Sequence, residues 1–163
     1  PLTAEYCNAS VCDEIKLAKD GAEIGGSDAV LTMDTDVLIP AALDGVITKE
    51  VAEHVKARVV VELANGPTTA EGDTELTQRN IDVIPDILAN AGGVYVSYLE
   101  WHAGKTGKSF SRDEVNQRLT TAMGKAWQAV SAFAKEHDVS YRTAAFSLGI
   151  QRILEAENKG KKG

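Results

Sequence analysis

This sequence has fewer basic than acidic residues and therefore lacks the excess of positive charge that usually supports nucleic-acid binding. Its 163 residues hold 17 lysines and arginines against 24 aspartates and glutamates, a formal net charge of -7. Phosphate backbones are bound by clustered basic side chains, and the one such cluster here, Lys159 to Gly163, is typical of a solvated tail. The charge balance therefore argues against a nucleic-acid partner.

Cysteines and long apolar runs are also scarce. Cys7 and Cys12 are the only cysteines, and no further thiol or nearby histidine completes a metal site with them. We expect two free thiols in a reducing compartment and no bound metal. No apolar run approaches the roughly 20 residues that span a bilayer, and no signal peptide is evident at the start. We therefore expect no membrane partner and a cytoplasmic location.

From position 30 onward, short apolar runs alternate with amphipathic stretches. Three runs predict buried strands: Val37-Leu38-Ile39, Val59-Val60-Val61 and Asp82 to Ile84. Two stretches between them predict helices, from a Thr48 cap through Val55 and from a Thr69 cap over Ala70 to Gln78. This alternation predicts an α/β fold, a partial Rossmann-like doubly wound parallel sheet followed by long carboxyl-terminal helices.

The flanking segments are expected to be helical. Ser10 is predicted to cap a helix that reaches Lys19, with Gly21 as its stop. Ser111 and Glu114 form a predicted capping box for a helix to about 136, a second helix is predicted to begin near 140, and residues 104–109 are expected to be an exposed loop. We expect a lead-in over 1–35, the second half of a dinucleotide-binding domain over 36–110, and a helical region with a basic tail over 111–163.

Three corners of small or amide-bearing residues follow the predicted strands. They are Ala41-Ala42, Asn65-Gly66 and Asn90-Ala91-Gly92-Gly93. In a parallel sheet they would share one rim, where a ligand approaches residues without bulk and asparagine offers both a donor and an acceptor. A carboxamide or a ribose would suit such a rim. Ordinary turn chemistry is the alternative for each corner taken singly.

Other polar residues give weaker indications. Ser97, two helical turns after Asn90, has the chemistry to bind a substrate carboxylate, although bonding to its own helix backbone is the commoner case. Asp86 and Glu100 are acid or base candidates, with capping or solvated roles as the alternative. The histidines show no catalytic or metal-binding spacing and are expected at the surface: His54, His102 and His137.

Several motifs occur together and in a fixed order. They are Leu38-Ile39-Pro40-Ala41-Ala42-Leu43, Ala64-Asn65-Gly66-Pro67-Thr68-Thr69, Pro85 to Val94 with Ser97-Tyr98 and Glu100-Trp101, and Arg142-Thr143-Ala144-Ala145. From about 36 to 159 the sequence closely resembles the carboxyl-terminal half of NAD(P)-dependent glutamate dehydrogenases. The related branch acting on leucine, phenylalanine or valine looks different around Asn65.

The resemblance implies specific roles. Ala41 and Ala42 would lie beside the cofactor, NAD or NADP, and Asn65 and Asn90 would contact its ribose and nicotinamide. Ser97 matches the family's serine that binds the side-chain carboxylate of the substrate. The family's catalytic lysine and aspartate and its glycine fingerprint belong to preceding parts of the enzyme, so no catalytic residue is expected in this chain.

The resemblance also implies a reaction and partners. The family interconverts glutamate with 2-oxoglutarate and ammonia by hydride transfer, as a homo-oligomer, a hexamer. Because this chain begins with Pro1, we expect a processed product or a piece of a longer enzyme, inactive without the missing amino-terminal part. The alternative is a stand-alone noncatalytic interaction or regulatory module derived from the same fold.

Overall fold

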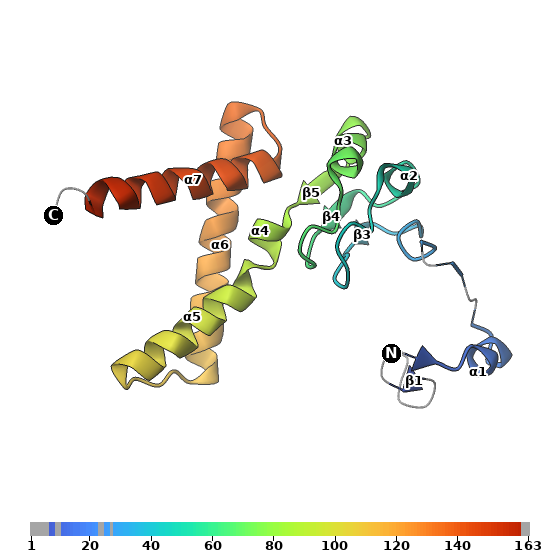
Figure 1. The fold of residues 1–163 in the computed structure, drawn as a ribbon, viewed down its shortest axis with the longest axis horizontal. Helices are drawn as coiled ribbons and strands as arrows, with labels where there is room; N and C mark the ends of the chain where they lie inside the picture. The colour runs from blue at the N-terminus through green and yellow to red at the C-terminus, as the bar shows by residue number, and fades with distance from the viewer. Residues whose placement is uncertain (1–6, 9–10, 23–24, 27, 161–163) are drawn as a thin grey trace.

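A small parallel sheet lies at the centre of the molecule, with three long helices on one side of it (Figure 1). The computed structural model describes residues 7–8, 11–22, 25–26 and 28–160. The elements up to the end of the sheet are β1 Cys7–Asn8, β2 Val11–Cys12, α1 Glu14–Lys19, β3 Val37–Leu38, α2 Lys49–Ala52, β4 Val59–Val61, α3 Ala70–Gln78 and β5 Asp82–Ile84. They are followed by α4 Asp86–Ala89, α5 Ala91–Thr106, α6 Arg112–His137 and α7 Tyr141–Gly160.

The amino-terminal segment stands apart from the sheet (Figure 1). The predicted helix start was wrong: α1 begins after Asp13, whose side chain accepts a 3.0 Å hydrogen bond from the backbone N–H of Lys16. The preceding Val11–Cys12 is a strand that pairs antiparallel with Cys7–Asn8, which excludes it from the helix. Ser10 and the cysteine thiols, predicted as a cap and as free groups, lie outside the described residues. Gly21, the predicted stop, follows α1 with a φ of 87°.

The predicted parallel sheet is confirmed. Its strand order is β3-β4-β5, with Val37 opposite Val59 and Val61 opposite Ile84. Helices α2 and α3 form the successive crossovers between these parallel strands, as parallel pairing requires. Ile39, predicted in the first strand, lies beyond β3, just before the proline that prevents continuation. The chain is thus an α/β protein with part of a Rossmann-like sheet.

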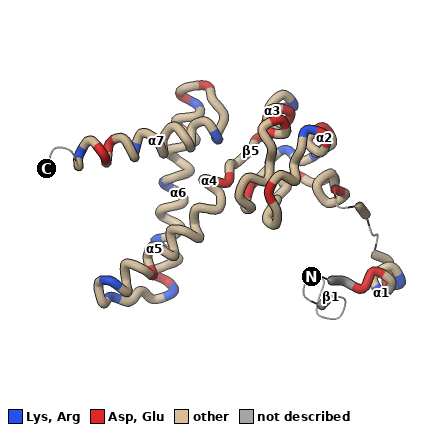
Figure 2. The backbone as a smooth tube through the Cα atoms, viewed as in Figure 1, with Lys and Arg blue, Asp and Glu red and all other residues tan. Residues whose placement is uncertain are grey.

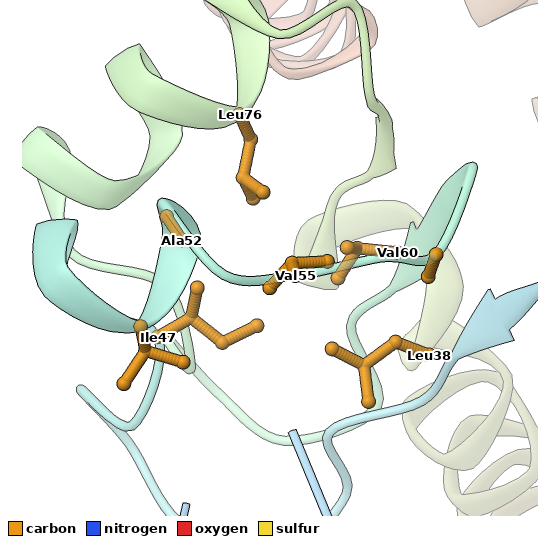
Figure 3. Close-up of a cluster of buried hydrophobic side chains, with 8 residues drawn as sticks. Leu38, Ile47, Ala52, Val55, Val60 and Leu76 are labelled. Carbon is orange, nitrogen blue, oxygen red and sulfur yellow. The ribbon is translucent and has the colours of Figure 1, made fainter. Parts of the chain in front are cut away.

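One hydrophobic core lies between the sheet and the two crossover helices (Figure 3). Its buried members are Leu38, Ile47, Val51, Ala52, Val55, Ala57, Val60 and Leu76. Burying a leucine or valine side chain contributes roughly 1.5–3 kcal/mol, so this cluster fixes α3 against β4. The predicted caps are both present, since Thr48 accepts from the N–H of Val51 at 3.4 Å and Thr69 from that of Gly72 at 3.1 Å.

The helix in the crossover after β3 is shorter than predicted. Helix α2 ends at Ala52, where the chain tightens: the N–H of His54 donates to the carbonyl of Val51, three residues back, at 2.9 Å. Val55 is nevertheless fully buried, as the predicted apolar stripe requires. The helical prediction over Ala70 to Gln78 matches α3 at both ends.

The carboxyl-terminal helices form a second core. Leu88 from α4 packs there with Val130 and Ala134 from α6 and Ala144 and Ala145 from α7. Helix α6 has the predicted capping box: Ser111 accepts from the N–H of Glu114 at 3.3 Å, and Glu114 from that of Ser111 at 2.8 Å.

The segment before α6 differs from the loop predicted over residues 104–109. Residues 104–106, expected in an exposed loop, continue α5, and the helix ends only at Gly107, whose φ is 66°. Glycine adopts this left-handed conformation without steric cost, so it fixes the helix end. Ser140 caps α7 as predicted, accepting from the N–H of Thr143 at 3.2 Å. Of the helices in the described part of the chain, none combines the length and apolar character of a membrane span.

Candidate functional site

Two of the predicted corners meet through their asparagine side chains. The Nδ2 of Asn90 donates to the Oδ1 of Asn65 at 2.7 Å. Longer contacts reach the carbonyl oxygens of Leu63 at 3.4 Å and Ala64 at 3.5 Å. The corner after β4 is thereby tied to the end of α4, the short helix that follows β5. The two asparagines form the centre of the rim that the sequence predicted.

The third corner joins the same rim. The backbone N–H groups of Leu63 and Ala64 both donate to the carbonyl of Pro40, at 3.0 and 2.9 Å. Ala41 and Ala42, which follow Pro40, are exposed. The three corners therefore lie at the carboxyl ends of three neighbouring parallel strands, where ligands bind in open α/β sheets. We call Ala41, Ala42, Asn65 and Asn90 the asparagine rim.

The asparagine pair keeps hydrogen-bonding groups available for a ligand. Asn65 is exposed and Asn90 is half-buried. Within the described residues, the Nδ2 of Asn65 and the Oδ1 of Asn90 have no hydrogen-bond partner, because their mutual bond uses the other two groups. One donor and one acceptor remain. A carboxamide, which itself carries one acceptor oxygen and an NH₂ donor, matches this pair.

Asp86 has a structural role at the rim. Its Oδ2 accepts from the N–H of Gly66 at 2.8 Å, and its Oδ1 accepts from that of Ile87 at 2.7 Å. Its own N–H donates to the Oε2 of Glu62 at 2.9 Å. Both oxygens are thus occupied by backbone groups of the corner and of α4. The geometry supports a structural role for Asp86, as acceptor for two backbone N–H groups, over an acid or base role.

Arg142 and the buried Glu62 form an ion pair that was not predicted. The Nη2 of Arg142, in α7, lies 2.8 Å from the Oε1 of Glu62, a residue with 0% exposure just after β4. Burial acts to lower the pKa of Arg142, but its hydrogen bonds to Glu62 and Asp73 outweigh burial and raise that pKa above its ordinary value. The signal was a glutamate directly after an apolar strand, because a buried carboxylate requires a partner.

Two further carboxylates surround the same guanidinium. Asp73 accepts from the Nε and Nη2 of Arg142 at 3.1 and 3.0 Å, and Asp86 lies 3.7 Å from its Nη1. Figure 2 shows the acidic positions of α3 and of the start of α4 that supply these groups. One arginine therefore joins α7 to three carboxylates of the sheet region. We call Glu62, Asp73, Asp86 and Arg142 the arginine cluster.

Ser97 and the other candidates lie apart from this network. Ser97 is exposed on α5, and among the described residues its side chain forms no hydrogen bond with the asparagine rim. Glu100 is exposed on the same helix. His54 and His137 are exposed and His102 is half-buried. Among the described residues, no three histidine, cysteine or acidic side chains are arranged to hold a metal ion.

Comparison with protein families gives a match over nearly the whole chain. Residues 5–160 match the model of the Glutamate/Leucine/Phenylalanine/Valine dehydrogenase family. The chain is 51% identical over 130 residues to the NAD-specific glutamate dehydrogenase A of Halobacterium salinarum, covering 80% of this chain and 30% of that protein. It is 43% identical over 155 residues to the NADP-specific glutamate dehydrogenase of Synechocystis, covering 95% of this chain and 35% of that protein.

Solved structures agree. Glutamate dehydrogenase from Peptoniphilus asaccharolyticus is similar with a TM-score of 0.70 and 45% identity, over 74% of this chain and 30% of that one. A hetero-hexameric glutamate dehydrogenase from Thermus thermophilus gives 0.76 and 29% identity, over 87% of this chain and 35% of that one. This chain thus spans about a third of the length of these relatives. It belongs to the glutamate/leucine/phenylalanine/valine dehydrogenase family.

Proposed function

We propose that this chain is part of a longer NAD(P)-dependent glutamate dehydrogenase and forms the nicotinamide side of its cofactor site. The observation that carries the proposal is the asparagine pair, which presents one free donor and one free acceptor at the carboxyl ends of parallel strands. The names of the two relatives supply the reaction and both cofactors. The proposal therefore includes NAD and NADP alike.

The residues of the rim have distinct tasks in this proposal. The side-chain NH₂ of Asn65 donates to the cofactor, and the side-chain oxygen of Asn90 accepts from it. The small side chains at Ala41 and Ala42 let the cofactor approach the backbone, and both residues are exposed. When bound there, the nicotinamide would supply the hydride acceptor for oxidation of the substrate at its α-carbon. The rim is proposed to hold the nicotinamide ring in the position and orientation that hydride transfer needs.

Ser97 is proposed to select the substrate. Its hydroxyl is exposed on α5, two turns beyond Asn90. We assign to it a hydrogen bond donated to the side-chain carboxylate of glutamate, or of 2-oxoglutarate in the reverse reaction with ammonia. A hydrogen bond to a charged group contributes about 1.5–3 kcal/mol, enough to prefer glutamate over an apolar amino acid by at least about tenfold.

The proposal extends to the missing parts of the enzyme. The proton-transfer lysine and aspartate belong to an amino-terminal part, and the assembly is a homohexamer. The edge strand β3 supports a larger sheet: Val37 in β3 and Ile39 just beyond it are 45% and 52% exposed, and unpaired apolar edges are normally covered. A neighbour described as a hetero-hexameric glutamate dehydrogenase supports an assembly of six subunits, and the identity of those subunits is part of the proposal.

Kinetics of the full-length protein test the proposal. We expect glutamate-dependent reduction of NAD or NADP, followed by the absorbance of the reduced nicotinamide. The Ser97→Ala variant should raise the KM for glutamate about tenfold and leave the rate with 2-aminopentanoate, which lacks the side-chain carboxylate, unchanged. Absence of glutamate-dependent turnover with both cofactors would refute the enzyme assignment. A Ser97→Ala effect that is equal for both amino acids would refute the role of Ser97.

A further inference from the structure

We propose that Arg142 is a positioning residue that holds the asparagine rim in its cofactor-binding geometry from helix α7. The inference rests on the proposed function, because it concerns the affinity of the same site. Arg142 lies outside the rim and touches neither asparagine. Its effect is transmitted through the carboxylates of the arginine cluster.

Arg142 contacts the chain just after each of the two strands that carry the asparagine corners. Its guanidinium holds the buried Glu62 at 2.8 Å and lies 3.7 Å from Asp86. Glu62 follows β4, and Asp86 follows β5. A planar guanidinium donates in fixed directions, so one group sets the separation of these two strand ends. Asp73, bound at 3.0 Å, fixes the guanidinium itself against α3.

Hydrogen bonds connect the carboxylates of the arginine cluster to the segments that carry the two asparagines. The Oε2 of Glu62 accepts from the N–H of Asp86 at 2.9 Å, and the Oδ2 of Asp86 accepts from that of Gly66 at 2.8 Å. Gly66 is the neighbour of Asn65. Asp86 begins α4, and Asn90 caps the carboxyl end of that helix. Asn90 therefore lies about one helical turn from Asp86, which Arg142 contacts, and Asn65 lies one residue from Gly66, which Asp86 binds.

The charges explain why the cluster responds to loss of its arginine. Three carboxylates share one guanidinium, and Glu62 has 0% exposure. Without Arg142, an unpaired buried carboxylate is strongly unfavourable, so Glu62 must take up a proton or move toward water. Either change alters the acceptor of the Asp86 N–H, and α4 moves with it. The distance between Asn65 and Asn90 then changes.

A purely structural role makes a different prediction. If Arg142 only fastens α7 to the sheet, its loss lowers stability but leaves the cofactor affinity of the folded enzyme unchanged. The test therefore compares affinity with stability in full-length enzyme. Arg142→Met removes the charge and keeps the aliphatic stem. Arg58→Met is the matched control, because Arg58 pairs with Asp36 at 3.0 Å at the opposite end of β4, where both side chains are about 80% exposed.

We would titrate NADH and NADPH into each folded variant and follow binding by fluorescence, with the kcat and the KM for glutamate measured alongside. Arg142→Met should raise the cofactor dissociation constant about tenfold, while Arg58→Met leaves it unchanged. Arg142→Lys, which keeps the charge near Glu62 but not the fork, should give a smaller rise. It also serves as the test variant if Arg142→Met does not fold.

A double-mutant cycle with Asn65→Ala completes the test. If Arg142 acts through the rim, the double variant should bind cofactor about as weakly as Asn65→Ala alone. Multiplying effects, or normal affinity in both folded Arg142 variants, would overturn the inference and leave the proposed function standing. An Asn65→Ala enzyme with normal affinity would overturn the proposed function and this inference together.

Discussion

The side chain of Asn90 donates a 2.7 Å hydrogen bond to the side-chain oxygen of Asn65, 25 positions earlier in the chain. Each residue occupies the corner after a different strand, and parallel pairing of β4 with β5 brings the corners together. The bond uses the NH₂ of Asn90 and the oxygen of Asn65, and it leaves the NH₂ of Asn65 and the oxygen of Asn90 without a partner among the described residues. It therefore turns two ordinary turn residues into a fixed pair that can recognise a carboxamide.

Replacing Leu76 should weaken the core between α3 and the sheet. Leu76 has 0% exposure, and Leu76→Ala is expected to cost about 2–5 kcal/mol of local stability. Native-state hydrogen exchange of the β4 amides in the full-length protein would measure this loss. Gln78→Ala, an exposed change in the same helix, is the control and should be close to neutral. Equal exchange rates in both variants would contradict the core described here.

Alanine substitutions at two helix glycines should have opposite effects. A Cβ at Gly72 in α3 would clash with the backbone carbonyl oxygen of Ile47, so Gly72→Ala must displace the helix and cost about 1–3 kcal/mol. A Cβ at Gly124 in α6 meets no atom within 4 Å, so Gly124→Ala should stabilise by up to about 1 kcal/mol. Hydrogen exchange within each helix would check the signs. A neutral Gly72→Ala would show that α3 does not pack as closely as described.

The capping box of α6 predicts a pH-dependent contribution to stability. Hydrogen bonds from the backbone N–H and hydroxyl of Ser111 hold the pKa of Glu114 below its usual range. A lowered pKa in the folded state gives stabilisation that is present at neutral pH and lost as pH falls through that pKa. Wild type should therefore exceed Glu114→Gln in thermal midpoint near neutral pH, and the gap should close in acid. A gap independent of pH would contradict this origin.

Local signals predicted much of the fold correctly. The strand at 59–61, the Thr69 cap and the capping box at Ser111 all depend on residues within a few positions of one another. The same signals failed where two local solutions compete. Asp13 caps as well as serine does, and the pairing of β1 with β2 decides between them. At the end of α5, Gly104 tolerates the helix and Gly107 ends it.

Some residues of the candidate site could likewise be predicted from the sequence, and others could not. The three corners were predictable because small residues and asparagines recur after successive strands. The arginine cluster was not, because Arg142 lies 69 positions from Asp73 and 80 from Glu62, and no spacing rule relates them. The buried glutamate after β4 indicates that a cation is needed, but only the packing of α7 identifies it.

Binding of the nicotinamide cofactor at the asparagine rim is best tested with the Asn65→Asp variant of the full-length enzyme. A carboxylate at position 65 still accepts the hydrogen bond from the side chain of Asn90, so the pair and the fold are kept. The aspartate side chain, however, has no NH₂ group to donate to the cofactor. We expect an unchanged thermal midpoint and a dissociation constant for NADH and NADPH at least about tenfold higher than that of wild type. Wild-type affinity for both cofactors in the folded variant would show that the side chain of Asn65 does not bind the cofactor.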